Sequence, residues 1–377
     1  MGLEIHLSAF SNLQPGNSET KSSRLLSISD LSIVYGSGGG DVYAVDRANL
    51  DIESDKFVTI VGESGCGKST VALAIIGLLA APPARIQSGR IEYKSVDLLS
   101  LVENERRKYR GTEIAMIFQE PLTSLNPVYK IGDQIAEAIV VREERKHNPN
   151  RVVRSEIMQK AYDTRVTSFP SRIQMPRRNL SSLFRDEILD ALKIVRIPDP
   201  DQVIDRYPFE LSGGMVQRVM IAMALAQKPA LLIADEPTTA LDVTTQAQVL
   251  KLMKVLMDEV NTSVILITHD LAVASQVADR VVVMYAGDLV EDAEVYDLFS
   301  EPLHPYSKGL LSCIPSGSKD NVKLNPIPGT VPDLTTLIPD CKYASRCPYV
   351  MEICRKKRPT LTEVKPKHRV ACFLYGR

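Results

Sequence analysis

The chain has 377 residues, of which 44% are hydrophobic and 24% charged, a composition that suits about two or three folded domains and excludes disorder throughout. Its 45 Lys and Arg residues balance 46 Asp and Glu residues, and the net charge of −1 argues against a general nucleic-acid binder. No apolar stretch reaches about 18 residues, and the start lacks a basic segment followed by an apolar one, so we expect neither a membrane span nor secretion.

Predicted strands and helices alternate along the chain. We interpret the polar residues 1–23 as a loose leader. An apolar helix pattern covers residues 70–79, and residues 131–200 are mostly helical in pattern. Because alternating strands and helices favour a mostly parallel sheet, we expect an α/β fold with ligands beyond the carboxyl ends of the strands. Apolar segments of strand length are Leu25–Ile33, Phe57–Val61, Ile114–Phe118, Leu231–Ala234, Val264–Thr268 and Val281–Tyr285.

Two segments are unusually basic. Residues 142–178 contain ten Lys or Arg and four acidic residues, a net charge of +6, and residues 341–377 contain ten and two, a net charge of +8. A solvated surface is one interpretation, and contact with a membrane-adjacent partner or lipid headgroups is the other.

The segment from Gly62 to Thr70 has the spacing of a phosphate-binding loop, G-x-x-x-x-G-K-[ST], between a predicted strand and a predicted helix. Glycines allow backbone N–H groups to face a phosphate chain, and the helix N-terminus adds attraction. Lys68 is placed for the β- and γ-phosphates and Ser69 for Mg²⁺. A purely structural turn is the alternative. The predicted nucleotide-binding residues here are Gly62, Ser64, Gly65, Cys66, Gly67, Lys68, Ser69 and Thr70.

Cys66 lies inside this loop, ahead of the predicted helix. A helix N-terminus lowers the pKa of a nearby thiol and favours oxidation. The other interpretation is a small residue that fits the loop.

Polar side chains follow three of the apolar strands. Asp235 and Glu236 follow Leu231–Ala234, so Asp235 is a candidate Mg²⁺ ligand and Glu236 a candidate general base that activates water. His269 follows the strand that ends at Thr268 and is a candidate contact for a γ-phosphate. Gln119 follows Phe118 and is a candidate contact for Mg²⁺ and the water. The alternative is that these are ordinary polar residues at strand ends.

The ordered motifs resemble those of ATP-binding-cassette (ABC) ATPases. Gly62–Ser69 resembles the Walker A motif, Leu231–Asp235 the Walker B motif, and Leu211–Arg218, with Ser212, Gly213 and Gly214, the family signature. Gln119 and His269 resemble the Q-loop and H-loop residues, and Thr239–Asp242 resembles the D-loop with Asp242. Tyr35 resembles the aromatic residue that stacks on adenine, with Tyr43 as the competitor.

Further segments resemble the oligopeptide, dipeptide and nickel permease ATPases. They are Gln119–Pro127, His304–Leu311, Ile327–Leu334 and Arg346–Tyr349. The resemblance implies a P-loop, RecA-like core with a helical subdomain at about residues 120–215 and a cysteine-containing C-terminal extension. We expect the ATPase domain at 24–300 and the extension at 301–377.

The resemblance also implies partners. ABC ATPases form head-to-tail dimers in which each ATP lies between the Walker A motif of one chain and the signature of the other. Each motif occurs once here, so a second ATPase subunit, often a different chain, is expected. Two transmembrane permease subunits and an extracytoplasmic solute-binding protein would complete an importer, with this chain peripheral on the cytoplasmic face of the membrane.

Six cysteines in a chain without a signal peptide point to a reducing compartment rather than a disulfide framework. Four of them, Cys341, Cys347, Cys354 and Cys372, have a spacing that differs from that of zinc fingers. Some members of the resembled subfamily hold a [4Fe–4S] cluster at such cysteines, so an iron–sulfur cluster is one hypothesis and zinc or unliganded or disulfide-bonded cysteines are the others. Cys313 lies outside the pattern.

The sequence therefore predicts an ATPase, with ATP and Mg²⁺ as cofactors, that powers import of di- or oligopeptides. A transporter of nickel or oligosaccharides is one alternative, and an ABC ATPase that is no part of a transporter is another. The ATPase does not contact the solute, so its sequence does not decide among solutes.

Overall fold

The computed structural model describes residues 24–38, 40–119, 124–147, 180–238, 242–313 and 326–376. The predicted leader 1–23, most of the basic segment 142–178 and residues 239–241 of the D-loop motif lie outside the described residues. No helix in the described ranges is both long enough and apolar enough to cross a bilayer.

The main sheet carries the predicted parallel strands. Its order is β11-β12-β10-β9-β3-β8-β7-β6, and the five strands from β9 to β6 are parallel. Every residue of β3, β7 and β8 is buried, as expected for apolar strands covered on both faces. The parallel strands are β3 (Phe57–Val61), β6 (Ile114–Ile117), β7 (Leu231–Asp235), β8 (Ser263–Thr268) and β9 (Arg280–Tyr285). The antiparallel strands are β10 (Asp288–Glu294), β11 (Thr362–Lys365) and β12 (His368–Val370).

A second, antiparallel sheet was not predicted. It has the order β2-β1-β4-β5, so the expectation of a mostly parallel sheet holds only for the strands around the site. Helix α1 (Lys68–Ile76) lies in an apolar core shared by the two sheets, which contains Ile28 of β1, Ile75 of α1 and Ile233 of β7. The strands are β1 (Arg24–Ser37), β2 (Gly40–Glu53), β4 (Ala84–Tyr93) and β5 (Val96–Asp97).

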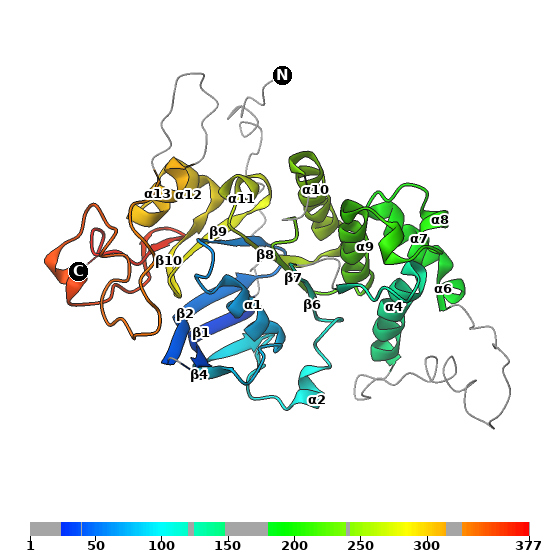
Figure 1. Ribbon diagram of the computed structural model, residues 1–377, viewed down its shortest axis with the longest axis horizontal. Helices are drawn as coiled ribbons and strands as arrows, with labels where there is room; N and C mark the ends of the chain where they lie inside the picture. Colours follow the sequence, from blue (N-terminus) through cyan, green and yellow to red (C-terminus); the bar gives the residue numbers. More distant parts are fainter. Residues whose placement is uncertain are drawn as a thin grey trace, which may run out of the picture.

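A helical region extends to one side of the main sheet (Figure 1). Apolar side chains of α4, α7 and α9, among them Ile139, Leu192 and Val219, form one core with α9 against β6. Helix α9 crosses the predicted subdomain boundary near residue 215. The helices are α4 (Ile131–His147), α6 (Leu180–Leu183), α7 (Arg185–Ile194), α8 (Pro200–Val203), the 3-10 turn η2 (Pro208–Glu210) and α9 (Gly213–Ala226).

The C-terminal extension continues the main sheet at the opposite end (Figure 1). It contributes the β11–β12 hairpin, whose β12 pairs with β10. Tyr306 and Tyr343 from the extension pack against Tyr285 of β9, with ring centres 4.7 and 5.1 Å from that of Tyr285. The remaining helices are α2 (Glu103–Arg106), α10 (Val243–Val260), α11 (Leu271–Val277), α12 (Val295–Ser300), α13 (Pro305–Ser312) and the 3-10 turn η3 (Glu352–Arg355).

Candidate functional site

Two glycines in the loop between β3 and α1 lie where a side chain would collide with the neighbouring backbone. Gly67 has φ +105°, and a Cβ there would collide with the Ala44 carbonyl oxygen and lie 2.7 Å from Met284 Cε. A Cβ at Gly62 would collide with the Met284 carbonyl oxygen. The loop is therefore packed closely against β2 and β9, and its shape is fixed by its neighbours.

Lys68, the first residue of α1, points back into the loop. Only 5% of the residue is exposed, and its ammonium group donates hydrogen bonds to the carbonyl oxygens of Gly62 at 2.8 Å and Glu63 at 2.9 Å. A buried cation at the centre of a glycine loop and at a helix N-terminus attracts phosphate.

Ser69 and Asp235 meet across the end of the sheet. The Ser69 hydroxyl donates a hydrogen bond of 2.9 Å to Asp235 Oδ1. Burial raises the pKa of the Asp235 carboxyl group and the neighbouring Glu236 raises it further, whereas the Ser69 hydrogen bond opposes the rise. Hydroxyl and carboxylate oxygens are ligands that Mg²⁺ accepts, and a bound cation would stabilise the ionised carboxylate, so these two residues fit such an ion.

Glu236, which follows β7, is hydrogen-bonded to side chains that follow the strands on either side of β7. Gln119, after β6, donates from Nε2 to Glu236 Oε2 at 3.0 Å, and His269, after β8, is hydrogen-bonded through Nδ1 to Glu236 Oε1 at 3.1 Å. The Glu236 side chain is 16% exposed and that of His269 is 58% exposed. Four predicted site residues, the fourth being Asp235, thus converge at one edge of the sheet.

Glu236 also has an unusual backbone, with φ +44°. Its N–H donates to the Ile267 carbonyl oxygen at 2.9 Å, which fixes this conformation against β8. Non-glycine residues with positive φ are uncommon and gather at functional sites. The Glu236 carboxyl group meets Gln119 and His269, while that of the adjacent Asp235 meets Ser69.

The signature residues lie apart from the phosphate loop. Ser212 caps α9 by accepting the Met215 N–H at 3.4 Å, and Gly213 and Gly214 open that helix. In Figure 1, α9 lies beyond β6 and β7 from α1. The structure therefore brings together Lys68, Ser69, Gln119, Asp235, Glu236 and His269 but leaves the signature at a different place on the surface.

Asp242 and Tyr35 have local partners. Asp242 accepts hydrogen bonds from the N–H and hydroxyl of Thr245 at the start of α10. The Tyr35 hydroxyl lies 3.5 Å from Thr70 Oγ1, beside the phosphate loop. The backbone N–H of Tyr43 instead donates to Leu334 of the extension. Of the two tyrosines, only Tyr35 has its hydroxyl in a hydrogen bond to a residue of α1 among the described contacts.

The structure does not favour a reactive Cys66. The residue is 2% exposed, and burial raises the pKa of its thiol, although Lys68 Nζ, 3.8 Å away, opposes the rise. A protonated, buried thiol is a weak nucleophile. The helix N-terminus does not outweigh burial here, and the interpretation as a small packed residue fits the observed geometry.

The four C-terminal cysteines line one small cavity, with His304, Tyr343 and apolar side chains. Burial raises the pKa of Cys341 to about 12 and raises that of Cys347 and Cys372, and neighbouring thiols raise these three pKa values further. All six cysteines are described and none forms a disulfide. Among the described residues, no group of three or more His, Cys, Asp or Glu side chains is arranged to hold a metal ion, so their placement gives the predicted cluster no support.

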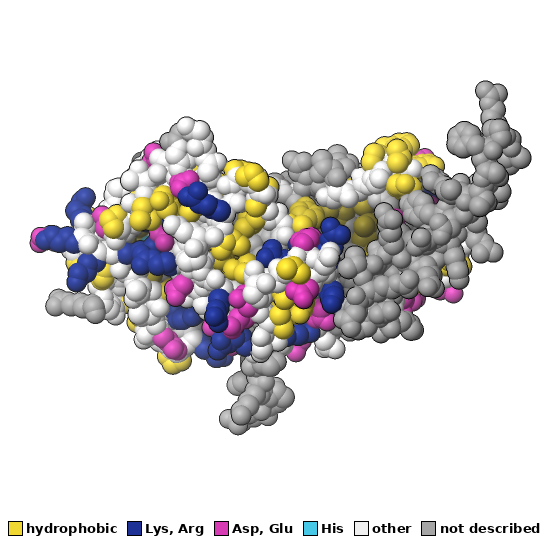
Figure 2. Space-filling model, turned by 90° about the horizontal axis from the view of Figure 1, so that it is seen from below, with side chains coloured by type: hydrophobic (Ala, Val, Ile, Leu, Met, Phe, Trp, Pro, Cys, Tyr) yellow, Lys and Arg dark blue, Asp and Glu magenta, His cyan; other side chains and the backbone are white. Residues whose placement is uncertain are grey.

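Many basic residues of the extension form ion pairs that the sequence did not predict. Lys342 is 3% exposed in its side chain and pairs with Asp46 at 3.4 Å and Asp288 at 2.7 Å. Figure 2 shows basic and acidic side chains next to one another at the end of the molecule that carries the extension. The excess of cations thus complements acids of the ATPase core, and neither predicted interpretation covered this. The cations paired with acids of the core are Lys342, Arg346, Arg358, Lys367 and Arg369, and Lys365 pairs with Glu301 at the start of the extension.

The fold and this edge of the sheet define a phosphate-loop ATPase. A family model described as ABC transporter matches residues 45–239, and one described as oligopeptide/dipeptide transporter, C-terminal region, matches residues 290–354. The chain belongs to the ABC transporter family and carries the C-terminal region of its oligopeptide/dipeptide branch.

Named relatives agree along nearly the whole chain. It is 43% identical to a probable peptide ABC transporter ATP-binding protein, y4tR, of Sinorhizobium fredii over 94% of this chain and 96% of that one. It is 44% identical to the oligopeptide transport ATP-binding protein AppD of Bacillus subtilis, over 94% and 97%. Among solved structures, the dimeric ABC transporter cassette MJ0796 matches with TM-score 0.56 and 25% identity, over 72% of this chain and 99% of that one.

Proposed function

We propose that this chain is the ATP-hydrolysing subunit of an importer for di- and oligopeptides. The observation that carries the ATPase part is the Glu236 carboxylate, held between Gln119 and His269 beside the Ser69–Asp235 pair. Relatives named for oligopeptide and dipeptide transport, and the matched C-terminal region, support the peptide part.

In the proposed reaction, Lys68 and the loop N–H groups bind the phosphate chain of ATP. Mg²⁺, held by Ser69 and Asp235 with Gln119 nearby, would neutralise phosphate charge when bound. Glu236 takes a proton from water, the water oxygen bonds to the γ-phosphorus, and the bond to the oxygen of departing ADP breaks. His269 donates a hydrogen bond to the γ-phosphate, and Tyr35 stacks on the adenine.

The proposed active state is a dimer. The position of Ser212, Gly213 and Gly214 at the start of α9, away from the chain's own phosphate loop, supports a signature that serves the ATP of a second chain. Asp242 would then face the partner at the interface. We propose a different ATPase chain as the partner, two membrane-spanning permease subunits, an extracytoplasmic binding protein, and a peripheral position on the cytoplasmic face of the membrane.

We further propose that Cys341, Cys347, Cys354 and Cys372 hold a [4Fe–4S] cluster. Their common cavity and its apolar lining support this, because a cluster needs four thiolates and protection from water. Anaerobic purification tests the proposal: bound iron and absorbance near ~400 nm are expected. Their absence, or their persistence after Cys347→Ser with Cys354→Ser, would reject the cluster.

Affinity purification of the full chain from gently solubilised native membranes tests the function. The proposal predicts two multi-span permease chains and a second ABC ATPase, and the accompanying binding protein can then be screened with peptides, nickel and oligosaccharides. Recovery only from the fraction without membranes, together with ribosomes or DNA, would overturn the transport proposal. Capture of nickel or an oligosaccharide instead of peptides would overturn the choice of solute alone.

A further inference from the structure

An ion pair joins the C-terminal extension to the phosphate loop. Arg346, in the cysteine-containing part of the extension, donates from its two terminal nitrogens to the two carboxylate oxygens of Glu63, at 2.9 and 3.0 Å. Glu63 is the residue directly after Gly62 in the loop. A two-pronged contact between arginine and carboxylate is the strongest and most directional ion pair available to side chains.

The arginine is itself held in place. Its side chain is 5% exposed. Nε donates to the Pro328 carbonyl oxygen at 2.9 Å, and the guanidinium group lies 5.7 Å from the centre of the Tyr285 ring. Pro328 and Tyr285 therefore hold the guanidinium group so that its two terminal nitrogens face Glu63.

A second contact from the extension reaches the same residue. The backbone N–H of Glu63 donates to the hydroxyl of Tyr306, on α13, at 3.0 Å, and Tyr306 is fully buried. The carbonyl oxygen of Glu63 accepts the hydrogen bond from Lys68 Nζ. Glu63 thus links two side chains of the extension to the lysine of the phosphate loop.

We propose that Arg346 is a positioning residue for ATP binding: it fixes Glu63 so that the phosphate loop is ordered before the nucleotide arrives. The inference rests on the proposed ATP site and goes beyond it by giving the extension a role at that site. A loop that must be ordered on binding lowers affinity, so removing the fork weakens ATP binding, by about tenfold, with little change in the chemical step.

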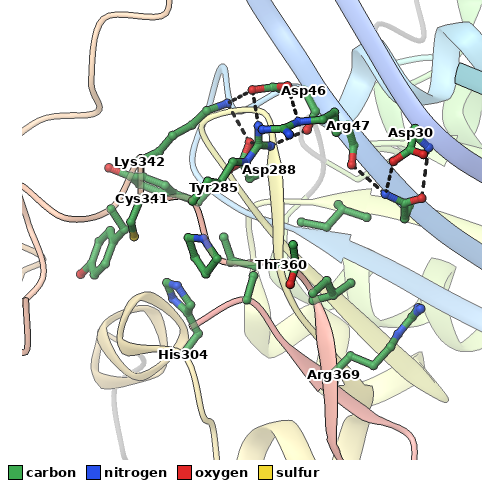
Figure 3. A pocket seen from close by; sticks show the side chains of 18 residues that line it. Asp30, Asp46, Arg47, Tyr285, Asp288, His304, Cys341, Lys342, Thr360 and Arg369 are labelled. Atoms are coloured by element: carbon green, nitrogen blue, oxygen red, sulfur yellow. Dashed lines mark hydrogen bonds and ion pairs between the residues drawn. The ribbon is translucent and has the colours of Figure 1, made fainter. Parts of the chain in front are cut away.

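A second bridge between extension and core provides the control. Figure 3 shows the cavity at this bridge, where Lys342 lies next to Asp46 and Asp288. The volume of the cavity is about 260 Å³. Arg358 donates to Asp46 and, at 2.6 Å, to Asp288. No residue from 62 to 70 lines this cavity. Arg358→Gln therefore loosens the docking of the extension without removing a contact to the phosphate loop.

The test compares Arg346→Gln, Arg346→Lys, Glu63→Gln and Arg358→Gln in the full-length chain. ATP affinity is measured by titration with a fluorescent ATP analogue, and KM and kcat in the complex purified from membranes. Arg346→Gln and Glu63→Gln are each expected to weaken ATP binding about tenfold, with kcat within about twofold of the wild-type value. The double variant is expected to bind ATP no more weakly than either single variant, because both substitutions remove the same contact. Arg346→Lys recovers part of the affinity, and Arg358→Gln stays near wild type.

Three results would overturn the inference while wild-type binding is normal. They are unchanged affinity in Glu63→Gln, additive losses in the double variant, and an equal loss in Arg358→Gln, which would make docking alone responsible. Glu63→Gln keeps the test decisive if Arg346→Gln fails to fold, because it leaves the other contacts of Arg346 in place. Failure of the wild-type chain to bind ATP would instead overturn the proposed function, and the inference with it.

Discussion

Strand pairing places the phosphate-loop end of the main sheet, whereas the C-terminal extension adds buried ion pairs to its β10–β12 pairing and its tyrosine packing. Strands β3, β7 and β8 are wholly buried and pair through backbone hydrogen bonds, so polar residues after them are placed by the sheet. The extension has few regular elements among its described residues, β11, β12, η3 and α13, and ion pairs such as Lys342–Asp288 join it to the core.

Charged residues therefore have different roles in the two regions. At the sheet edge, Lys68 donates to backbone carbonyl oxygens of the phosphate loop. Glu236 is hydrogen-bonded to Gln119 and His269, side chains that follow neighbouring strands. In the extension, charged residues such as Arg358 form ion pairs that hold a loop-rich segment to the core. The comparison predicts that substitutions at the sheet edge change activity, whereas those in the extension change stability, with Arg346 as the exception argued above.

The largest effect is expected at Glu236. Glu236→Gln keeps the hydrogen-bonding shape but removes the base, so kcat for ATP hydrolysis is expected to fall by about 10²- to 10⁴-fold while ATP binding persists. Steady-state hydrolysis and nucleotide titration of the same preparation provide the check. Hydrolysis at the wild-type rate would show that Glu236 is not the base.

The next effect is a loss of stability at Lys342. Lys342→Met leaves Asp46 and Asp288 short of a partner in a buried site, so a loss of about 3 kcal/mol is expected, in the range for breaking a buried pair. Hydrogen exchange is expected to rise in residues 341–376 and stay unchanged in β3 and β8.

The matched control is Lys367→Met. Lys367 and Glu294 form a pair with side chains 77% and 48% exposed, and such pairs contribute below about 1 kcal/mol. Equal losses in the two variants would contradict the view that burial makes the extension's ion pairs important.

A smaller effect depends on pH. Burial lowers the pKa of His304, the N-cap of α13, to about 4 from an ordinary 6.5. Between pH 6.5 and 4, His304 therefore takes up a proton more readily in the unfolded chain than in the folded one. The free energy of unfolding falls as the pH drops through this range, and the contribution of His304 to that loss is about 2.5 kcal/mol at pH 4.5. Denaturant unfolding at pH 7 and 4.5 is the measurement. His304→Asn, which retains an N-cap acceptor, should have a shallower pH dependence; an unchanged one would refute the assignment.

The smallest effect is expected at Tyr35. Loss of the proposed adenine stacking in Tyr35→Ala is expected to cost about 0.5–1.5 kcal/mol, so KM for ATP should rise about two- to tenfold with kcat little changed. Tyr43→Ala is the comparison. A larger increase in KM for Tyr43→Ala would reassign the adenine contact to that residue.

The sequence predicted the regular part of this molecule better than the irregular part. Central strands such as β3 and β8 are continuous apolar segments, which are distinctive in sequence. Strand β4 was missed because residues 87–90 in its middle are exposed and are either polar or, at Gly89, glycine. The alternation that marks a half-buried strand is absent there.

At the candidate site, too, the sequence predicted the residues that follow regular elements and missed a contact made by the loop-rich extension. Lys68, Asp235 and His269 follow strands or a glycine loop, so local patterns found them. The contact between Glu63 and Arg346 joins residues 283 positions apart. No spacing predicts which of the extension's many cations meets one particular carboxylate, because that depends on how the extension folds over the core.

Solute-dependent ATP hydrolysis tests the account most directly. The complex purified from membranes is reconstituted in lipid vesicles with its binding protein, and ATP hydrolysis is measured with and without peptides, for the wild-type chain and Glu236→Gln. The account predicts hydrolysis that rises when peptide is added and is lost in Glu236→Gln. Hydrolysis that ignores peptide, or that survives in the variant, would contradict it.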